Sequence, residues 1–238
     1  MYISDIIVFA SVIKRTIVKI ITKRLTNEEK DKYKLEGYLR VILIGNILGD
    51  AHMKKSNISI NSKANASVRF LQSVAQAEFI YHLYDLFKDF CASPPKKSSS
   101  LIKETGKIIH SIYFATRNLP YFYDLYSLFN NNRIKIIPSI FEDLLTPVNL
   151  AYWIMGDGSW IRYGLKLHTN NFSKEEVILL IKAINTKFNL NSLINVTDEL
   201  KSQYTIYIPS KKIALLKSLV LPYFIPCFLK INYKLNIK

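Results

Sequence analysis

The chain carries the same short pattern twice, about half its length apart. Residues 43–51 read Leu-Ile-Gly-Asn-Ile-Leu-Gly-Asp-Ala, and residues 150–158 read Leu-Ala-Tyr-Trp-Ile-Met-Gly-Asp-Gly. Each copy is an apolar run that ends in a Gly-Asp pair, and 107 positions separate Asp50 from Asp157 in a chain of 238 residues. A duplicated segment that delivers one carboxylate per copy predicts two pseudo-symmetric halves that meet at a shared acidic site.

The charge balance points to a polyanionic partner. The chain has 33 Lys and Arg against 18 Asp and Glu, a formal net charge of +15. Such an excess is typical of proteins that bind nucleic acid or an anionic membrane surface. The length suits one large domain or two small ones, and a hydrophobic content of 49% is enough for two cores of about 100 residues each.

The two cysteines exclude some kinds of site. Cys91 and Cys227 form no CxxC pair and have no accompanying histidine cluster, so we expect neither a zinc site nor a disulfide, but two buried thiols. Lysine, isoleucine and asparagine are abundant, a usage typical of AT-rich genomes. We therefore expect an organellar protein, mitochondrial in the first instance, with the chloroplast as the alternative.

The N-terminal residues 1–25 form a separate basic extension. They mix an apolar run with Lys14, Arg15, Lys19, Lys23 and Arg24, and no run reaches the roughly 18 apolar residues of a membrane span. We expect an amphipathic helix that packs on the domain or contacts nucleic acid. A membrane-surface or targeting helix is the alternative, and it is the sole basis for a third functional class, a basic membrane-associated protein.

The rest of the chain divides into a first half, residues 26–134, and a second half, residues 135–238. In the first half we expect helices at 26–36, 38–49, 74–90 and 120–130, strands at 52–60, 66–72 and 107–116, and a loop at 93–100, with 100–104 as a candidate partner strand for 107–116. The second half repeats this order, with helices at 147–156, 173–188 and 210–220 and strands near 160–169, 192–198 and 203–209. Each half therefore has the order αββαββα, which predicts an α+β fold with helices on one face of each antiparallel sheet.

The duplicated helices suggest a cation site. Gly45 and Gly49 share one helix face, where small residues permit close helix packing, and Tyr152 replaces Gly45 in the second copy, so we expect the close contact near Gly49 and Gly156. A carboxylate at a helix C-terminus faces the negative end of the dipole, and two such ends repel each other. Mg²⁺ would resolve this, bound by Asp50 and Asp157 with backbone carbonyls at Gly49 and Gly156, phosphate oxygens and water. Bound metal activates water and stabilises the leaving oxygen of a phosphodiester.

Either Gly-Asp pair alone is also compatible with a simple helix stop before a turn. Two copies in matching contexts, each followed by a predicted strand pair, favour a functional role. No HxH, HExxH or GxSxG pattern offers a competing chemistry.

The two segments resemble the signature of the LAGLIDADG homing endonucleases, in their single-chain form with two motifs. The resemblance extends over residues 26–235. It includes Thr146-Pro147 before the second motif, the Pro222-Tyr-Phe-Ile-Pro226 stretch and the closing Tyr233-Lys234-Leu235.

The resemblance implies a fold and an activity. The two αββαββα halves would form a saddle of antiparallel sheets over the DNA major groove, with the motif helices at the interface and a divalent metal on each aspartate. The enzyme would act as a monomer and cut both strands of a long asymmetric double-stranded site, leaving short 3′ overhangs. One basic residue per half often assists: Lys135 fits the first position, and either Lys230 or Lys234 fits the second.

The predicted strands supply candidate DNA contacts. Apolar residues occupy odd positions from 161 to 167, and the basic Arg162, Lys166 and His168 occupy even ones, so a period of two assigns the basic set to a solvent or ligand face. Arg and Lys read guanine edges in the major groove, and Asn or Gln reads adenine. The remaining candidates are Gln203, Thr205 and Tyr207 in the second half and His52, Lys54, Arg69 and Gln72 in the first, with Ser111 and Tyr113 as weaker ones.

Two functions on this fold remain open. The first is a site-specific DNA endonuclease encoded within a group I intron. The second is a maturase that binds and stabilises its own intron RNA. A pure maturase can lose either aspartate, whereas this chain has both, which favours cleavage.

Overall fold

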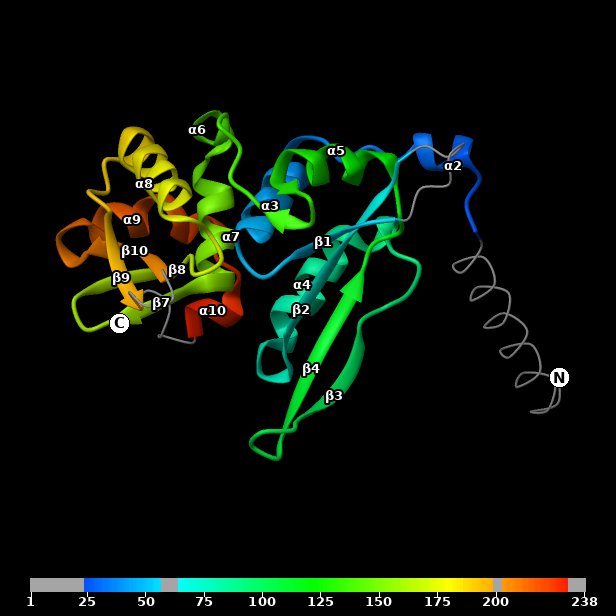
Figure 1. Ribbon diagram of the computed structural model, residues 1–238, viewed down its shortest axis with the longest axis horizontal. Helices are drawn as coiled ribbons and strands as arrows, with labels where there is room; N and C mark the ends of the chain where they lie inside the picture. The colour runs from blue at the N-terminus through cyan, green and yellow to red at the C-terminus, as the bar shows by residue number, and fades with distance from the viewer. Residues whose placement is uncertain (1–23, 57–63, 199–202, 231–238) are drawn as a thin grey trace, which may run out of the picture.

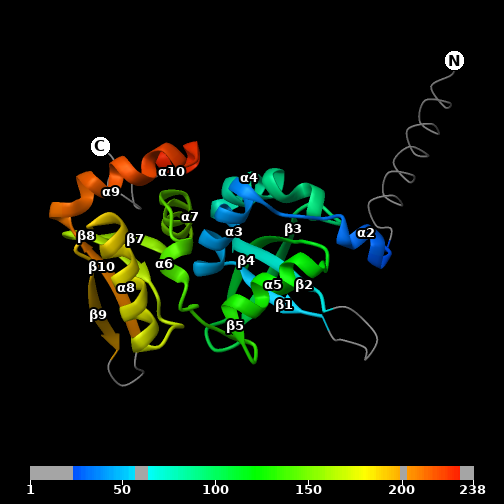
Figure 2. The ribbon, with the colours of Figure 1, turned by 90° about the horizontal axis from the view of Figure 1, so that it is seen from above.

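The computed structural model describes residues 24–56, 64–198 and 203–230 (Figure 1). Within them, two four-stranded antiparallel sheets lie on either side of a central pair of helices, α3 (Gly37–Leu48) and α7 (Pro147–Asp157) (Figures 1 and 2). Most of the predicted N-terminal extension, residues 1–23, lies outside the described residues.

The first half follows the predicted order αββαββα. A short helix, α2 (Asn27–Asp31), precedes α3, and its N-terminus has a capping box between Thr26 and Glu29. The sheet has the strand order β1-β2-β4-β3. Its elements are β1 (His52–Lys55), β2 (Ala66–Ser73), α4 (Ala77–Phe87), β3 (Lys96–Ile102), β4 (Lys107–Ala115) and α5 (Pro120–Phe129).

The second half repeats this topology after a linker. The linker contains the strand pair β5 (Asn130–Asn131) and β6 (Ile134–Lys135) and the helix α6 (Phe141–Leu144). The second sheet has the equivalent strand order, β7-β8-β10-β9. Its elements are α7, β7 (Gly158–Ile161), β8 (Gly164–His168), α8 (Lys174–Phe188), β9 (Leu193–Asp198), β10 (Gln203–Pro209) and α9 (Ile213–Val220), followed by α10 (Pro226–Lys230).

The predicted α+β fold of two αββαββα halves is confirmed, and three local predictions were wrong. Residues 93–100 were predicted as a loop, but β3 begins at Lys96 and pairs with β4 along its whole length. The predicted helix at 26–36 ends at Asp31. The strand pair predicted near 160–169 is present as a hairpin, but the single alternation assumed over residues 160–168 does not hold, because Arg162 and Tyr163 form the turn between β7 and β8. The predicted boundary between residues 134 and 135 falls within β6.

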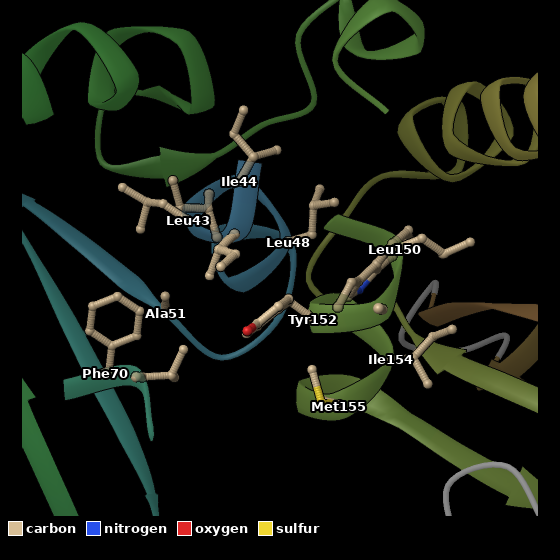
Figure 3. Close-up of a cluster of buried hydrophobic side chains, with 14 of the residues drawn as sticks. Leu43, Ile44, Leu48, Ala51, Phe70, Leu150, Tyr152, Ile154 and Met155 are labelled. Carbon is tan, nitrogen blue, oxygen red and sulfur yellow. The ribbon is translucent and has the colours of Figure 1, made fainter. Parts of the chain in front are cut away.

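Burial of α3 on all sides explains its sequence. Residues 42–48 are all buried, which is what an apolar pattern around the whole helix predicts. Figure 3 shows how Leu43, Ile44 and Leu48 lie in the same cluster as Leu150 and Tyr152 of α7. The one polar side chain in this stretch donates within its own helix, from Asn46 Nδ2 to Ile42 O at 2.9 Å.

The predicted contact near Gly49 and Gly156 is present, but the closest approach of the two helices is at Gly45. A methyl group built on Gly45 would lie 2.4 Å from the backbone oxygen of Asn149, which no real side chain could occupy. At Gly49 and Gly156 the same construction meets its nearest atoms at 3.7 Å and 3.6 Å, ordinary van der Waals distances. Asn149 lies in the first turn of α7, so the helices cross where α7 begins and Tyr152 is accommodated beyond the crossing.

A hydrogen bond also joins the halves away from the crossing. His82 Nε2 of α4 lies 2.8 Å from the hydroxyl of Tyr152 of α7, and the two rings are stacked with centroids 6.0 Å apart. Burial lowers the pKa of His82 below its usual value, and the charge of Asp85 opposes this shift. Burial also raises the pKa of Tyr152, so the contact joins a neutral imidazole to a neutral phenol.

The cysteines differ in burial. Cys91 is buried, and burial raises the pKa of its thiol to about 12. Cys227 is only half-buried, so the prediction of two buried thiols is right for Cys91 alone. In the described part of the chain, both cysteines are thiols rather than members of a disulfide. Over residues 24–56, 64–198 and 203–230, the structure has no helix with the length and apolar character to cross a bilayer.

Replacing Gly45 with alanine should destabilise the protein. The added methyl group forces two helix backbones apart, and overpacking of this kind costs about 1–3 kcal/mol even though alanine favours the helix. The free energy of unfolding from denaturant titration should fall by about this amount. Gly156→Ala is the matched control, because its methyl group finds ordinary contacts and should leave stability nearly unchanged. Equal effects of the two substitutions would contradict the assignment of the crossing point.

Stability should decline in mild acid because of His82. Its pKa is lowered in the folded protein relative to about 6.5 in the unfolded chain, so the unfolded state binds the proton more readily. The free energy of unfolding should therefore fall as pH drops below about 6.5 and continue to fall towards the folded-state pKa. His82→Gln removes this titration, so the loss of stability between about pH 7.5 and 5.5 should be smaller in the variant. Parallel pH dependences in the two proteins would rule out this origin.

Candidate functional site

A cavity of about 470 Å³ lies where the two halves meet. The ends of α3 and α7 supply Asp50 and Asp157 to its lining, and β6 supplies Lys135. The three candidate catalytic residues that the structure describes fully are therefore brought together. Of the alternatives for the second basic residue, Lys234 lies outside the described residues, and the side chain of Lys230 does too.

Each aspartate lies beside the glycine that precedes the other aspartate. A methyl group built on Gly156 would be 3.6 Å from Asp50 Oδ2, and one on Gly49 would be 3.8 Å from Asp157 Oδ2. This crossed arrangement brings the two carboxylates to the same end of the helix pair. A side chain larger than a methyl group at Gly49 or Gly156 would compete with the carboxylates for this space.

Lys135 connects the linker to the end of α3. Its ammonium donates hydrogen bonds to the carbonyl oxygens of Gly49 at 2.9 Å and Leu48 at 3.4 Å, and it lies 5.5 Å from the ring centroid of Phe172. These carbonyls lack partners within the helix, and a cation at this end also interacts favourably with the helix dipole. The Gly49 carbonyl, a predicted metal ligand, is thus already engaged by Lys135.

Burial and charge act in opposite directions on Lys135. Burial lowers the pKa of its ammonium below the usual value, while the negative charges of Asp157 and Asp50 raise it. Burial is the larger effect, so the pKa of Lys135 is lowered overall. A lysine that loses its proton more readily than usual, close to two carboxylates, is suited to proton exchange with a bound substrate.

Gln72 holds Asp50 rather than facing outward. Its Nε2 donates to Asp50 Oδ2, and it lies on the same side of β2 as the buried Phe70, opposite to Arg69. Gln72 was predicted as a DNA contact; its side chain instead lies at the aspartate site. The equivalent position of the second half is Thr169, counted from the aspartate and the strand register, and its hydroxyl donates to the Tyr204 carbonyl at 2.8 Å.

The open face of the first sheet carries the other predicted contacts. His52 pairs with Arg69 across β1 and β2, and both side chains are exposed together with Lys54. The Arg69 guanidinium lies over the ring of Tyr113 at 4.3 Å from its centroid. Stacking of this kind leaves the edge of the guanidinium available for hydrogen bonds.

On the second sheet, Arg162 is the one basic residue of the predicted set that does not lie on the open face. Lys166 and His168 lie on the open side of β8, opposite Tyr207 and Thr205 of β10. Arg162 belongs to the hairpin turn, where its guanidinium lies 5.0 Å from the ring centroid of Tyr163.

Three predicted contacts on β10 are engaged within the protein. Thr205 is fully buried and lies 3.2 Å from the hydroxyl of Thr197. The Tyr207 hydroxyl donates to the Tyr163 carbonyl at 2.9 Å, and Gln203 Oε1 accepts from Asn170 at 3.4 Å. A period-two pattern reports the face of a strand but not which neighbours cover it.

Sequence reasoning missed several polar residues of the cavity. Asn170 and Asn171 lie just beyond Thr169, which follows β8, and Arg133 lies in the turn between β5 and β6. The run Asn130-Asn-Asn-Arg133 marks a turn in the sequence, but nothing local indicates that this turn folds back beside the aspartates. His52 and His168 also line the cavity, so two predicted contacts lie at its edge.

The donor set fits a hard cation. Asp50 and Asp157 offer carboxylate oxygens at one end of an open cavity, and in the described part of the chain no cluster of three or more His, Cys, Asp or Glu residues competes as a metal site. Mg²⁺ is commonly held by one or two carboxylates and completes its shell with water and substrate phosphates. Two carboxylates in a cavity open to substrate satisfy this requirement.

Comparison with known proteins agrees with the duplicated fold. The model of the LAGLIDADG DNA endonuclease family matches residues 40–216. A cytochrome b mRNA maturase, bI2, of Debaryomyces hansenii is 30% identical over 228 residues, which are 93% of this chain and 82% of that protein. A probable intron-encoded endonuclease of Wickerhamomyces canadensis is 36% identical over 201 residues, 81% of each chain.

A solved structure agrees as well. The homing endonuclease I-WcaI, bound to its DNA recognition sequence, superimposes with a TM-score of 0.74 at 32% identity over 87% of this chain and 89% of that one. With two equivalent halves, paired aspartates at the ends of α3 and α7, and a family match over most of its length, the chain belongs to the LAGLIDADG DNA endonuclease family.

Proposed function

We propose that the protein is a site-specific homing endonuclease that makes a metal-dependent double-strand break in a long, asymmetric DNA target. The observation that carries this proposal is the crossed pair of aspartates, each beside the other helix's glycine, in one cavity between two sheets with basic open faces. Membership of the LAGLIDADG DNA endonuclease family supports it.

The proposed cofactor is Mg²⁺, held by Asp50 and Asp157. Such an ion supplies activation of water and stabilisation of the charge that develops on phosphate oxygens. Gln72 donates to Asp50 Oδ2 and so restricts the orientation of that carboxylate. Gly156 is retained as a candidate carbonyl ligand, whereas the Gly49 carbonyl would have to share its oxygen with Lys135.

Lys135 is the proposed basic partner of the first half. In free protein its ammonium offsets the two carboxylates and holds the end of α3. When a phosphodiester enters the cavity, the ammonium is positioned to donate to a phosphate oxygen, and its lowered pKa assists proton exchange during hydrolysis. The second-half partner, Lys230 or Lys234, remains open.

The proposed DNA surface consists of the open faces of the two sheets, which differ in their side chains and strand lengths. On the first sheet it uses His52, Lys54 and Arg69, and on the second Lys166, His168 and the turn residue Arg162. The central strands β2 and β4 have 8 and 9 residues, whereas their equivalents β8 and β10 have 5 and 7. Because the two halves differ in side chains and strand lengths, each is suited to a different half of the DNA target, which favours an asymmetric target sequence.

The cleavage target can be found directly. Purified protein with Mg²⁺ is incubated with a randomised duplex library, and cleaved molecules are sequenced. We expect one long, non-palindromic consensus. Absence of any enriched sequence, with the protein folded, would overturn the proposal of site-specific cleavage.

Removing either carboxylate charge should stop cleavage without preventing DNA binding. Asp50→Asn or Asp157→Asn keeps the side-chain volume but weakens metal binding, so we expect at least a 10²-fold loss of double-strand cleavage, on the order expected for loss of a metal ligand. Affinity for the target, measured in Ca²⁺ or without metal, should remain within about tenfold. Wild-type cleavage of both strands by either variant would reject the catalytic assignment.

Substitutions of Lys135 should distinguish a role of its positive charge from a role in proton exchange. Lys135→Met removes both and should reduce the single-turnover cleavage rate by about 10- to 10³-fold, with a smaller change in affinity. Lys135→Arg retains the charge but cannot lose a proton at working pH. If arginine restores the full rate, Lys135 acts through its charge alone; if binding falls more than cleavage in Lys135→Met, it is a phosphate contact instead.

An RNA maturase is the second candidate function. The Debaryomyces hansenii relative, at 30% identity, is named as an mRNA maturase, and the net charge of +15 suits RNA as well as DNA. If the protein has this activity, Asp50→Asn should still promote splicing of the host intron RNA in vitro while failing to cut DNA. Loss of both activities together, in a folded variant, would argue that splicing does not use a separate surface.

We also propose that the protein acts in an organelle and serves intron mobility. The excess of lysine over arginine is typical of translation from an AT-rich genome, and the relatives are named for cytochrome b mRNA and for an intron-encoded endonuclease. The mitochondrion is the favoured compartment and the chloroplast the alternative.

A further inference from the structure

A second polar cavity, of about 550 Å³, adjoins the aspartate cavity on the first half. It lies between the end of β1, the C-terminal part of α5 and the turn that joins β5 to β6. Asn130 and Arg133 line both cavities, so this turn forms the wall between them. The proposed nuclease function makes no use of the second cavity.

The lining of the second cavity combines cations with aromatic rings. Lys55 Nζ lies 5.5 Å from the ring centroid of Tyr123, and Tyr123 is itself stacked with Tyr126 at 6.3 Å between centroids. Ser127 and Asn132 add a hydroxyl and an amide. Cations for a phosphate, an aromatic face for a base, and small polar groups for a base edge are the elements by which proteins bind unpaired nucleotides.

The second cavity is not on the open face that would meet duplex DNA. Met53 of β1 is buried against the helices, and Lys55, two residues further, lies on that same side of the strand and reaches Tyr123 of α5. Lys54 lies on the opposite, open side together with Arg69. Adjacent lysines therefore serve different surfaces.

The turn between the cavities has an unusual backbone. Asn132 and Arg133 have φ angles of 47° and 69°, in the left-handed region that glycine favours. Asparagine tolerates this conformation, but arginine does so rarely. Strained residues of this kind gather at binding sites, because selection keeps the side chain despite its conformational cost. In this turn the retained side chain is that of Arg133, a cation that lines both cavities.

We propose that the second cavity binds an unpaired nucleotide of a single-stranded nucleic acid. Lys55 and Arg133 hold the phosphate, and the base takes the place of the Lys55 side chain over the ring of Tyr123. The chemistry is shared by two sources, a loop of structured RNA and a single-stranded end of DNA. This site is independent of Asp50 and Asp157, so it stands or falls separately from the endonuclease.

The adjacent lysines provide a matched test. Binding of the full chain is measured by fluorescence anisotropy with three probes: a single-stranded RNA of about 10 nucleotides, DNA of the same sequence and length, and a duplex. Lys55→Ala should weaken single-strand binding by about fivefold or more and leave duplex binding within about twofold. Lys54→Ala should weaken duplex binding by about fivefold or more and leave single-strand binding within about twofold. If Lys55→Ala weakens all three probes equally, or none, the proposal is wrong.

Arg133→Gly tests the turn without a risk of misfolding. Glycine relieves the left-handed strain, so the melting temperature should not fall. Single-strand affinity should nevertheless drop by about fivefold. An unchanged affinity would remove Arg133 from the site.

Photo-crosslinking identifies the surface and the source. A probe with 5-iodouracil at one position is irradiated with the protein, and the linked peptide is identified by mass spectrometry. Linkage to Tyr123 or Tyr126 that depends on Lys55 supports the site, and linkage confined to the open sheet faces overturns it. A preference for the RNA probe over the DNA probe identifies an RNA loop as the ligand; equal binding identifies a single-stranded end of either kind.

Discussion

The contact between Gly45 of α3 and the backbone of Asn149 determines how the two halves meet. The absence of a side chain at Gly45 lets the helices approach at backbone distance near the start of α7. From that crossing, α3 and α7 continue side by side, so that Gly49-Asp50 and Gly156-Asp157 lie next to each other. The position of each carboxylate beside the opposite glycine is a consequence of packing about one turn earlier in α3 and about two turns earlier in α7, because close-packed helices transmit such constraints rigidly.

The resulting site concentrates negative charge that folding alone would not favour. Two helix C-termini and two carboxylates converge, and each contributes repulsion. Lys135 relieves part of it by donating to the carbonyls of Leu48 and Gly49, at the cost of partial desolvation. The linker is therefore more than a tether: its β5–β6 pair delivers the cation that lets the acidic ends coexist.

The sequence was sufficient for the fold and for the two aspartates, because those features repeat and obey local rules. The all-round apolar pattern of α3 and the Ser173–Glu176 capping box both describe contacts within a few residues. The errors arose where the pattern depends on a partner. Strand β3 shows no alternation because most of its side chains are exposed on both faces of a sheet edge. In the β7–β8 hairpin, the side chains that face inward are at even-numbered positions in β7 and at odd-numbered positions in β8. One continuous alternation across the turn therefore assigned Ile161 to the wrong face. The crossing at Gly45 and the Lys135 contact join residues far apart in the chain, and no local pattern encodes them.

The halves share a topology but not an environment for their acids. Gln72 donates to Asp50, whereas the equivalent Thr169 is turned to the Tyr204 carbonyl and helps hold β8 to β10. The longer first sheet also presents Arg69 on an aromatic support, while the second sheet commits Tyr207 to its own hairpin turn. The first half has a constrained carboxylate and a second polar cavity, whereas the equivalent polar group of the second half stabilises a shorter sheet. The difference implies that the two strands of a bound duplex meet chemically unequal surroundings at the same central cavity.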